Sequence, residues 1–306
     1  MQTARLEGVY PIVATPFRSD GAPDFEDLHR LVEFIVAARV DGVVFPGVAS
    51  EFDTLAADER RDLVQATASA VAGRVPLVVG VSAADATTAA ALARQARSLG
   101  AAAVMAMAPP AMRGNPVAQL DYFHSIGEHG APIILQNAPA PTGCGLAPEE
   151  CLELVRSVSG IEYVKEEALP SGQRITKLLA ANLPQLKGVF GGAGGRYITD
   201  ELARGACGTM PACELADLHV AQFRAHRVGD RAGVRRWYNR MLPLLNFQAV
   251  FRMAMTKETL RRRGIIAHAG KRAAGPELDP GDHRELGELL AEVADLLHPP
   301  LQAAYA

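Results

Sequence analysis

The sequence has few cysteines, and they are not arranged to bind a metal. Its 306 residues contain only four, which are Cys144, Cys151, Cys207 and Cys213. No two of them form a Cys-x-x-Cys pair, and no histidine stands at metal-ligand spacing from them. Because free thiols are typical of a reducing compartment, we expect a cytoplasmic protein with unpaired cysteines and no metal site.

The chain also lacks a basic excess and long apolar runs. Its net charge is −3 and its pI about 6.3, whereas nucleic-acid-binding proteins usually carry a basic patch or a high pI. The short run Arg261–Arg263 is better explained as a solvated helix end. No apolar stretch has the length and composition of a membrane span, and the N-terminus lacks the apolar region of a secretory signal. We therefore expect neither a nucleic acid nor a membrane as a partner.

What the chain does contain is a regular alternation of short apolar segments and longer amphipathic ones. We expect strands near residues 8–14, 41–46, 76–81, 101–107, 132–136, 161–165, 187–191 and 206–210. Helices are expected near residues 24–39, 58–72, 84–98, 115–128, 147–158, 171–181 and 196–204. The strand segments are continuously apolar, which is typical of parallel strands that are covered on both faces.

About eight strand–helix units in succession favour a (β/α)8 TIM barrel. A doubly wound open sheet is the alternative, but no Gly-x-Gly-x-x-Gly motif follows the first strand. After residue 210 the pattern becomes mainly helical. We therefore predict a barrel over residues 1–212 and a C-terminal helical region, packed on the barrel, over residues 213–306.

One lysine stands where a barrel carries its chemistry. Of five lysines only Lys165, in the stretch IEYVKEE, ends a predicted strand, and barrel active sites lie at the carboxyl ends of the strands. Burial favours the neutral amine, and a neutral amine attacks a ketone to form a Schiff base. Alternatively, the lysine extends towards solvent and pairs with Glu166 or Glu167. The lysine alone leaves both interpretations open, and its place in the barrel favours catalysis.

The loop after the second strand, FPGVASEF, is a candidate anion site. Successive backbone amides near Ala49 and Ser50, together with the Ser50 hydroxyl, are suited to hold a carboxylate. The alternative is an ordinary loop in which Ser50 or Asp53 caps a helix.

Three other strand ends carry candidate groups. Gln136 and Asn137 end the fifth strand, where their polar side chains suggest a polar target. The glycine-rich stretch after the seventh strand, which includes Gly192, is placed where such barrels often bind phosphate, although glycine repeats are weak signals. Glu214, after the eighth strand, is either an acid/base carboxylate or a helix N-cap.

Four motifs occur in an order and at a spacing that resemble a known family. They are GVYPIVATPF, DGVVFPGVASE, QNAPAPTG and YVKEE, and the resemblance extends over about residues 5–300. The sequence resembles the dihydrodipicolinate synthase / N-acetylneuraminate lyase family. The resemblance implies a (β/α)8 barrel with a C-terminal helical region and commonly a homotetramer. It also implies a small-molecule 2-keto acid substrate that forms a Schiff base on Lys165, without a cofactor.

The sequence departs from the family pattern at three places. The usual Gly-Thr-Thr-Gly-Glu reads Gly-Val-Ala-Ser-Glu at residues 47–51, so both threonines are absent. Gln136 replaces a tyrosine that relays protons in many members, and Pro141 replaces the arginine with which the synthases hold a second carboxylate. We therefore expect neither dihydrodipicolinate synthase activity nor ordinary sialic-acid lyase activity. The sequence is more similar to the dehydratases of 2-keto-3-deoxy sugar acids such as L-2-keto-3-deoxyarabonate.

These residues lead to a mechanistic hypothesis. Lys165 condenses with the C2 carbonyl, and loss of the C3 proton and the C4 hydroxyl gives dehydration. Glu214 and Glu51 are the acid/base candidates, while Gln136 and Asn137 position substrate or water. We expect Glu166 and Glu167 to be mainly structural, because strand alternation turns Glu166 away from Lys165.

Two other functions stay open. Breaking the C3–C4 bond of the same imine would make the protein a pyruvate-releasing aldolase. Loss of the tyrosine and the threonines would also suit a keto-acid sensor that has no catalytic activity.

Overall fold

The computed structural model describes residues 5–129 and 132–298. Within these residues the chain forms two compact units. Unit 1 comprises the described residues of Met1–Gly8, Pro76–Ala193 and Tyr197–Met210, and unit 2 comprises the described residues of Val9–Val75, Gly194–Arg196 and Pro211–Ala306. Strand β1 (Gly8–Val9) lies where the chain first passes from one unit to the other.

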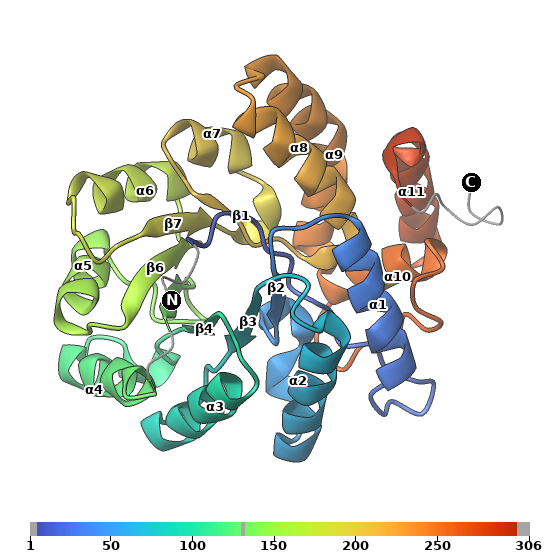
Figure 1. Ribbon diagram of the computed structural model, residues 1–306. Helices are drawn as coiled ribbons and strands as arrows, with labels where there is room; N and C mark the ends of the chain where they lie inside the picture. Colours follow the sequence, from blue (N-terminus) through green and yellow to red (C-terminus); the bar gives the residue numbers. More distant parts are fainter. Residues whose placement is uncertain (1–4, 130–131, 299–306) are drawn as a thin grey trace. The chain divides into compact units, whose positions relative to one another are not determined.

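Parallel strands form the centre of unit 1 (Figure 1). In hydrogen-bonded order they are β3 (Leu77–Gly80), β4 (Ala103–Ala106), β5 (Ile133–Asn137), β6 (Ile161–Glu166), β7 (Gly188–Gly191) and β8 (Gly208–Thr209). The register places Gln136, Lys165 and Phe190 in one row across β5, β6 and β7. Adjacent residues in a row point to the same side of a sheet, so this row brings Gln136 and Lys165 together.

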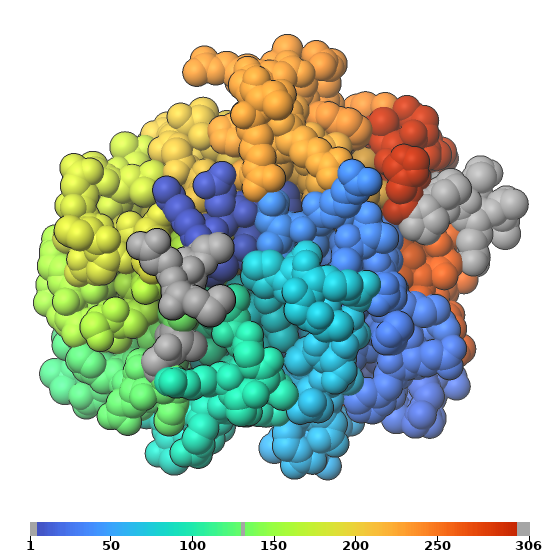
Figure 2. All heavy atoms as spheres, viewed as in Figure 1, coloured from blue at the N-terminus to red at the C-terminus, as the bar shows by residue number. Residues whose placement is uncertain are grey.

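A helix follows each of the strands β3 to β7, and in Figure 1 α3 to α6 lie outside the strands of unit 1. The helices are α3 (Ala86–Ser98), α4 (Pro116–Gly127), α5 (Pro148–Ser157), α6 (Ser171–Ala180) and α7 (Ile198–Ala203). In α3 the buried residues are Ala89, Ala93 and Ala96, spaced so that they form one helical face. Side chains from α3 and α4 form part of the surface seen in Figure 2, in teal and green.

Unit 2 contains the second strand and its flanking helices. These elements are α1 (Phe25–Ala37), β2 (Val43–Phe45) and α2 (Ala57–Val71), with the 3-10 turns η1 (Val48–Ser50) and η2 (Phe52–Thr54) between β2 and α2. The side chain of Asp24 caps α1 by accepting from two backbone amides of the first turn. Ile12 forms parallel bridges with Val44 and Ala212.

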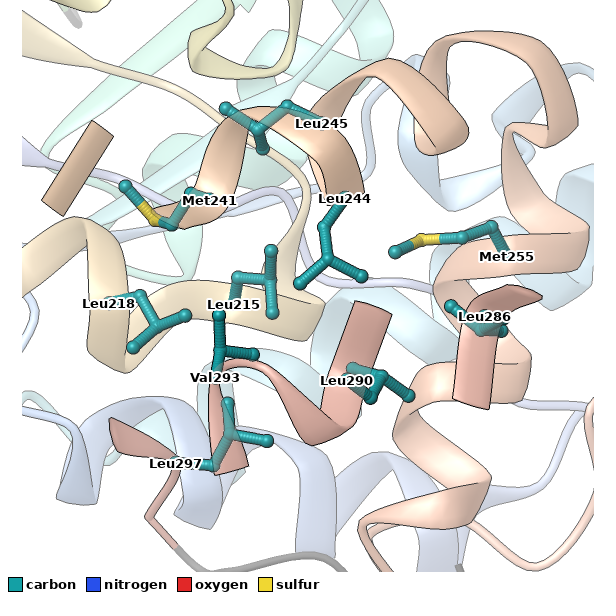
Figure 3. Packing of buried hydrophobic residues seen from close by; sticks show 10 residues of the cluster. All are labelled: Leu215, Leu218, Met241, Leu244, Leu245, Met255, Leu286, Leu290, Val293 and Leu297. Carbon is teal, nitrogen blue, oxygen red and sulfur yellow. The ribbon is translucent and has the colours of Figure 1, made fainter. Parts of the chain in front are cut away.

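The C-terminal part of unit 2 is helical and has its own apolar core. Its helices are α8 (Ala216–Arg227), α9 (Arg231–Phe251), α10 (Met253–Arg262) and α11 (Pro280–Ala291), preceded by the 3-10 turn η5 (Cys213–Leu215). Ten buried residues form this core, and Figure 3 shows side chains from these elements pointing toward one another. They are Leu215, Leu218, Met241, Leu244, Leu245, Met255, Leu286, Leu290, Val293 and Leu297.

The fold prediction is confirmed, and most predicted elements are present. The parallel strands, the helices between them and the C-terminal helices are those of a (β/α)8 barrel with a helical appendage. The predicted first strand is too long, since only Gly8–Val9 is a strand and Ile12 contributes isolated bridges. The segment over residues 230–256, expected to be helical with breaks, is two helices, and Arg252 adopts a positive φ of 49° between them. The division at residue 212 stays a prediction.

Candidate active site

Lys165 is the penultimate residue of β6, and its side chain is only 4% exposed. Its ammonium nitrogen Nζ lies 3.2 Å from Oε1 of Glu167. Side chains two residues apart along an extended chain point to the same face, so Glu167 is on the Lys165 side and Glu166 is on the other. The buried lysine therefore has a carboxylate within ion-pair distance in unit 1.

Glu167 receives hydrogen bonds on both oxygens. Gln136 Nε2 donates to Oε2 at 2.7 Å, and the backbone N–H of Ala193 donates to Oε1 at 3.3 Å. Burial alone would raise the pKa of Glu167, but the charge of Lys165 and these hydrogen bonds lower it on balance. Glu167 is therefore an ionised carboxylate at neutral pH. This contact is the pairing with Glu167 that the alternative interpretation of the lysine expects, and the mainly structural role of Glu167 stays a prediction.

Gly192 makes room for this carboxylate. A Cβ added at Gly192 would overlap the side chain of Glu167. Its role as a substrate-binding residue, expected from the glycine-rich stretch, stays a prediction. What the geometry adds is a steric reason for glycine at this position.

Glu166 lies on the opposite face and belongs to a separate network. Arg174 Nε is 3.2 Å from its Oε1, and Asn137 Nδ2 donates to its Oε2 at 3.0 Å. Burial raises the pKa of Glu166, and the hydrogen bond from Asn137 and the charge of Arg174 oppose the shift. Asn137 also exchanges hydrogen bonds with the backbone of Leu146, at 2.8 and 2.9 Å. The polar atoms of Asn137 thus bind the protein itself, and its proposed contact with substrate is untested.

The candidate carboxylate-binding loop lies in unit 2 and is held from several directions. The Ser50 hydroxyl donates to Val13 O at 2.5 Å and accepts from Gly47 N–H at 2.9 Å. Ser50 N–H donates to Gly47 O, and Thr15 Oγ1 donates to Ser50 O at 2.6 Å. Ser50 therefore uses its backbone N–H, its backbone C=O and its hydroxyl in hydrogen bonds that shape the loop. Ala49, the other member of the predicted pair, takes part in none of these bonds.

Glu51 is fully buried and paired with a second buried lysine. Lys257 Nζ lies 2.5 Å from Glu51 Oε1 and donates to Gly270 O at 2.8 Å. The backbone amides of Arg272 and Ala273 both donate to Glu51 Oε2 at 2.6 Å. Burial lowers the pKa of Lys257 to about 8, although the adjacent Glu51 opposes the shift. Glu51 therefore joins the loop after β2 to the C-terminal segment of unit 2.

Glu214 is buried in η5 of unit 2. Its Oε2 has no hydrogen-bond partner within the part of the chain that the structure describes. Burial raises the pKa of Glu214 to about 7, with hydrogen bonding and Arg263 opposing the shift. A carboxyl group with such a pKa is suited to give or take a proton near neutral pH.

The predicted site residues thus form two sets. Lys165, Gln136, Asn137 and Gly192 belong to unit 1, and Ala49, Ser50, Glu51 and Glu214 belong to unit 2. Among residues 5–129 and 132–298, no group of three or more His, Cys, Asp or Glu residues could hold a metal ion. Over the same residues no helix has the length and apolarity needed to cross a membrane.

Comparison with known proteins points to one family. The model of the Dihydrodipicolinate synthetase family matches residues 5–289. The chain is 30% identical over 289 residues to the L-2-keto-3-deoxyarabonate dehydratase of Azospirillum brasilense, covering 93% of each chain. It is also 30% identical over 269 residues to a 4-hydroxy-tetrahydrodipicolinate synthase of Xanthomonas axonopodis pv. citri, covering 86% of this chain and 87% of the relative.

A solved structure of similar fold is the dihydrodipicolinate synthase of Rhodopseudomonas palustris. It aligns with a TM-score of 0.88 at 27% identity, covering 95% of this chain and 98% of that one.

Proposed function

Because the chain belongs to the dihydrodipicolinate synthetase family, we propose that it is a lyase that dehydrates a 2-keto-3-deoxy sugar acid through a Schiff base on Lys165. The observation that carries the proposal is the contact of the buried Lys165 with Glu167, which Gln136 orients. A buried amine beside an ionised carboxylate can form an imine and then pass protons at the adjacent carbon. The similarity to a dehydratase supports the choice of reaction within the family.

In the proposed reaction the substrate carboxylate binds the backbone amide of Ala49, while Ser50 shapes the loop around it. Lys165 attacks the C2 carbonyl, water leaves, and the protonated imine makes the C3 proton acidic. C3 is separated from the imine nitrogen only by C2, and the carboxylate of Glu167 lies 3.2 Å from Nζ. Glu167 is therefore the proposed base, and its lowered pKa keeps it ionised for this step.

Loss of the C4 hydroxyl as water needs a proton donor. Glu214 keeps this proposed role, because its raised pKa leaves a large protonated fraction at neutral pH. Gln136 cannot titrate, so its proposed part is to orient Glu167 through the bond from Nε2. Glu51 is bound to Lys257, Arg272 and Ala273, which suits a residue that fixes the binding loop better than an acid or base.

The experiment that tests the proposal supplies 2-keto-3-deoxyarabonate and identifies the product. The proposal predicts a product that keeps all the carbon atoms of the substrate, and no release of pyruvate. Free pyruvate as the main product would replace dehydration by aldol cleavage. No turnover of any keto acid in a panel would favour a binding protein instead.

We propose that the active protein is a cytoplasmic homotetramer that needs no cofactor. Sedimentation velocity should then give four times the chain mass, and full activity should survive exhaustive dialysis against a chelator. A monomer with full activity would contradict the proposed assembly.

A further inference from the structure

A buried carboxyl group that the proposed mechanism does not use lies behind the carboxyl end of β7. Glu201 of α7 is fully buried, and its Oε1 accepts a hydrogen bond from Ser171 Oγ at 2.8 Å. Its Oε2 is buried and has no hydrogen-bond partner among the residues described. A buried charge with an oxygen that no donor reaches is expensive, so these surroundings favour the neutral acid. Consistently, burial raises the pKa of Glu201 to about 7 against the effect of the Ser171 hydrogen bond.

Two successive glycines connect Glu201 with the proposed catalytic pair. A Cβ at Gly191 would overlap the carboxyl of Glu201, and a Cβ at Gly192 would overlap the side chain of Glu167. Both carboxyl groups therefore pack directly against the same short piece of backbone. Glu167 in turn contacts Lys165.

The charges around Glu201 are mostly negative. Three carboxylates favour the protonated form of Glu201: Glu166 of β6, Glu167 just after it, and Asp200 of α7. The nearby cations are already engaged by other carboxylates: Arg174 by Glu166, Lys165 by Glu167, and Arg204 by Asp200. A negative charge on Glu201 would add to that of Glu167 and attract the positive charge of Lys165 more strongly.

We propose that Glu201 is a positioning residue that acts as a neutral acid. In this form it adds no negative charge beside Gly191 and Gly192, so the Lys165 amine can release its proton and form the imine. This inference rests on the proposed Schiff-base role of Lys165. When Glu201 ionises, imine formation slows, although Glu201 touches neither Lys165 nor substrate.

The test compares the wild type with Glu201→Gln, which has the same shape and no charge. Each protein is incubated with pyruvate and cyanoborohydride at pH values from about 6 to about 9, and the rate of adduct formation at Lys165 is measured by peptide mass spectrometry. The ratio of the Glu201→Gln rate to the wild-type rate should be close to unity at the acidic end. It should rise about three- to ten-fold at the alkaline end, where wild-type Glu201 is ionised.

Two further variants make the outcome decisive. Glu153→Gln removes an exposed carboxylate from α5 and should give a rate ratio that changes little with pH. Ser171→Ala removes the hydrogen-bond donor to Glu201 Oε1, so the slowing of adduct formation seen in the wild type should move to higher pH. If Glu201→Gln does not fold, the pH profile of Ser171→Ala tests the inference in its place. A Glu201→Gln rate ratio that is constant with pH, or an unshifted Ser171→Ala profile, overturns the inference and leaves the proposed function standing. Absence of any wild-type adduct at Lys165 overturns the proposed function, and the inference with it.

Discussion

Among single residues, Lys165 and Glu167 combine burial with a close opposite charge. Lys165 is 4% exposed and Glu167 is 16% exposed, so little water screens their contact. The contact keeps the lysine amine and the Glu167 carboxylate 3.2 Å apart. The same carboxylate can then accept the proton that the amine must lose. The pair is thus held ready to exchange protons, while Gln136 and the Ala193 amide keep Glu167 in place.

Replacing Glu167 by glutamine tests this division of roles. Glu167→Gln keeps the side-chain volume but removes the proposed base, so turnover should fall by about 10²–10⁴-fold. Because Lys165 still carries the amine, the imine with pyruvate should still form and be trapped by borohydride.

The matched control is Glu162→Gln on the same strand. Glu162, the second residue of β6, lies 2.7 Å from Lys187. Removal of its charge should leave turnover nearly unchanged. Wild-type turnover in Glu167→Gln would remove Glu167 from the mechanism.

The sequence allowed Lys165 to be chosen, because a lone lysine at a strand end is visible in the pattern. The contact of Glu167 was predictable too, since residues two apart on a strand share a face, and pairing with Glu166 or Glu167 was one of the two interpretations of the lysine. The buried environments of Glu201 and Lys257 could not be predicted from the sequence. Their environment is made by segments distant in the chain, such as Ser171 and Gly191 for Glu201, or Glu51 and Gly270 for Lys257.

Among elements, the loop after β2 depends on the C-terminal segment for its conformation. Lys257 of α10 binds Glu51, and its Nζ also lies 4.1 Å from the centre of the Phe17 ring. The guanidinium of Arg272 contacts the same ring and binds both oxygens of Glu59 at 2.7 Å. The proposed carboxylate-binding amides are therefore held by an ionic network within unit 2.

Removing one partner of the buried pair should be costly. Lys257→Met leaves the Glu51 carboxylate buried without its cation, which is expected to lower the free energy of unfolding by about 3–5 kcal/mol. The double variant Lys257→Met with Glu51→Gln should lose less than the sum of the single losses, because no unpaired charge remains.

Chemical denaturation measures these differences. Lys177→Met is the control, because Lys177 is 64% exposed and its contact with Glu149 is long, at 4.0 Å. This change should lower the free energy of unfolding by less than about 1 kcal/mol. A loss for Lys257→Met that is no larger than the Lys177 loss would show that the pair does not stabilise the protein.

The sequence predicted the elements better than their ends. The apolar periodicity located most strands and helices within a few residues, because buried faces impose it directly. It overestimated β1, where residues after Val9 stay buried without continuing the strand ladder. A break was expected within the helical segment over residues 230–256, and it lies at Arg252.

At the scale of the whole molecule, buried titratable groups make stability depend on pH. The pKa of Glu214 is raised from 4.5 to about 7 in the folded protein. The folded state therefore binds the extra proton between these values, and the stability that this group contributes is full below pH 4.5 and is lost as the pH rises through 7. His219 acts in the opposite direction, because burial lowers its pKa from 6.5 to about 4, so its contribution is lost as the pH falls through that range.

The variant Glu214→Gln isolates the carboxyl group. Its free energy of unfolding, relative to wild type, should rise by about 3 kcal/mol between the acidic and alkaline ends of the range, because the glutamine never ionises. Denaturant titrations at several pH values measure this difference, with the exposed Glu288→Gln as the control. A difference between Glu214→Gln and wild type that does not change with pH would mean that Glu214 ionises freely in the folded protein.

The most direct test of the whole account is chemical trapping of the proposed imine. The intact protein is incubated with pyruvate and reduced with borohydride, and the modified residue is located by peptide mass spectrometry. The account predicts one adduct, at Lys165, that is absent from Lys165→Ala. An unmodified Lys165, or an adduct that forms equally well in Lys165→Ala, would contradict it.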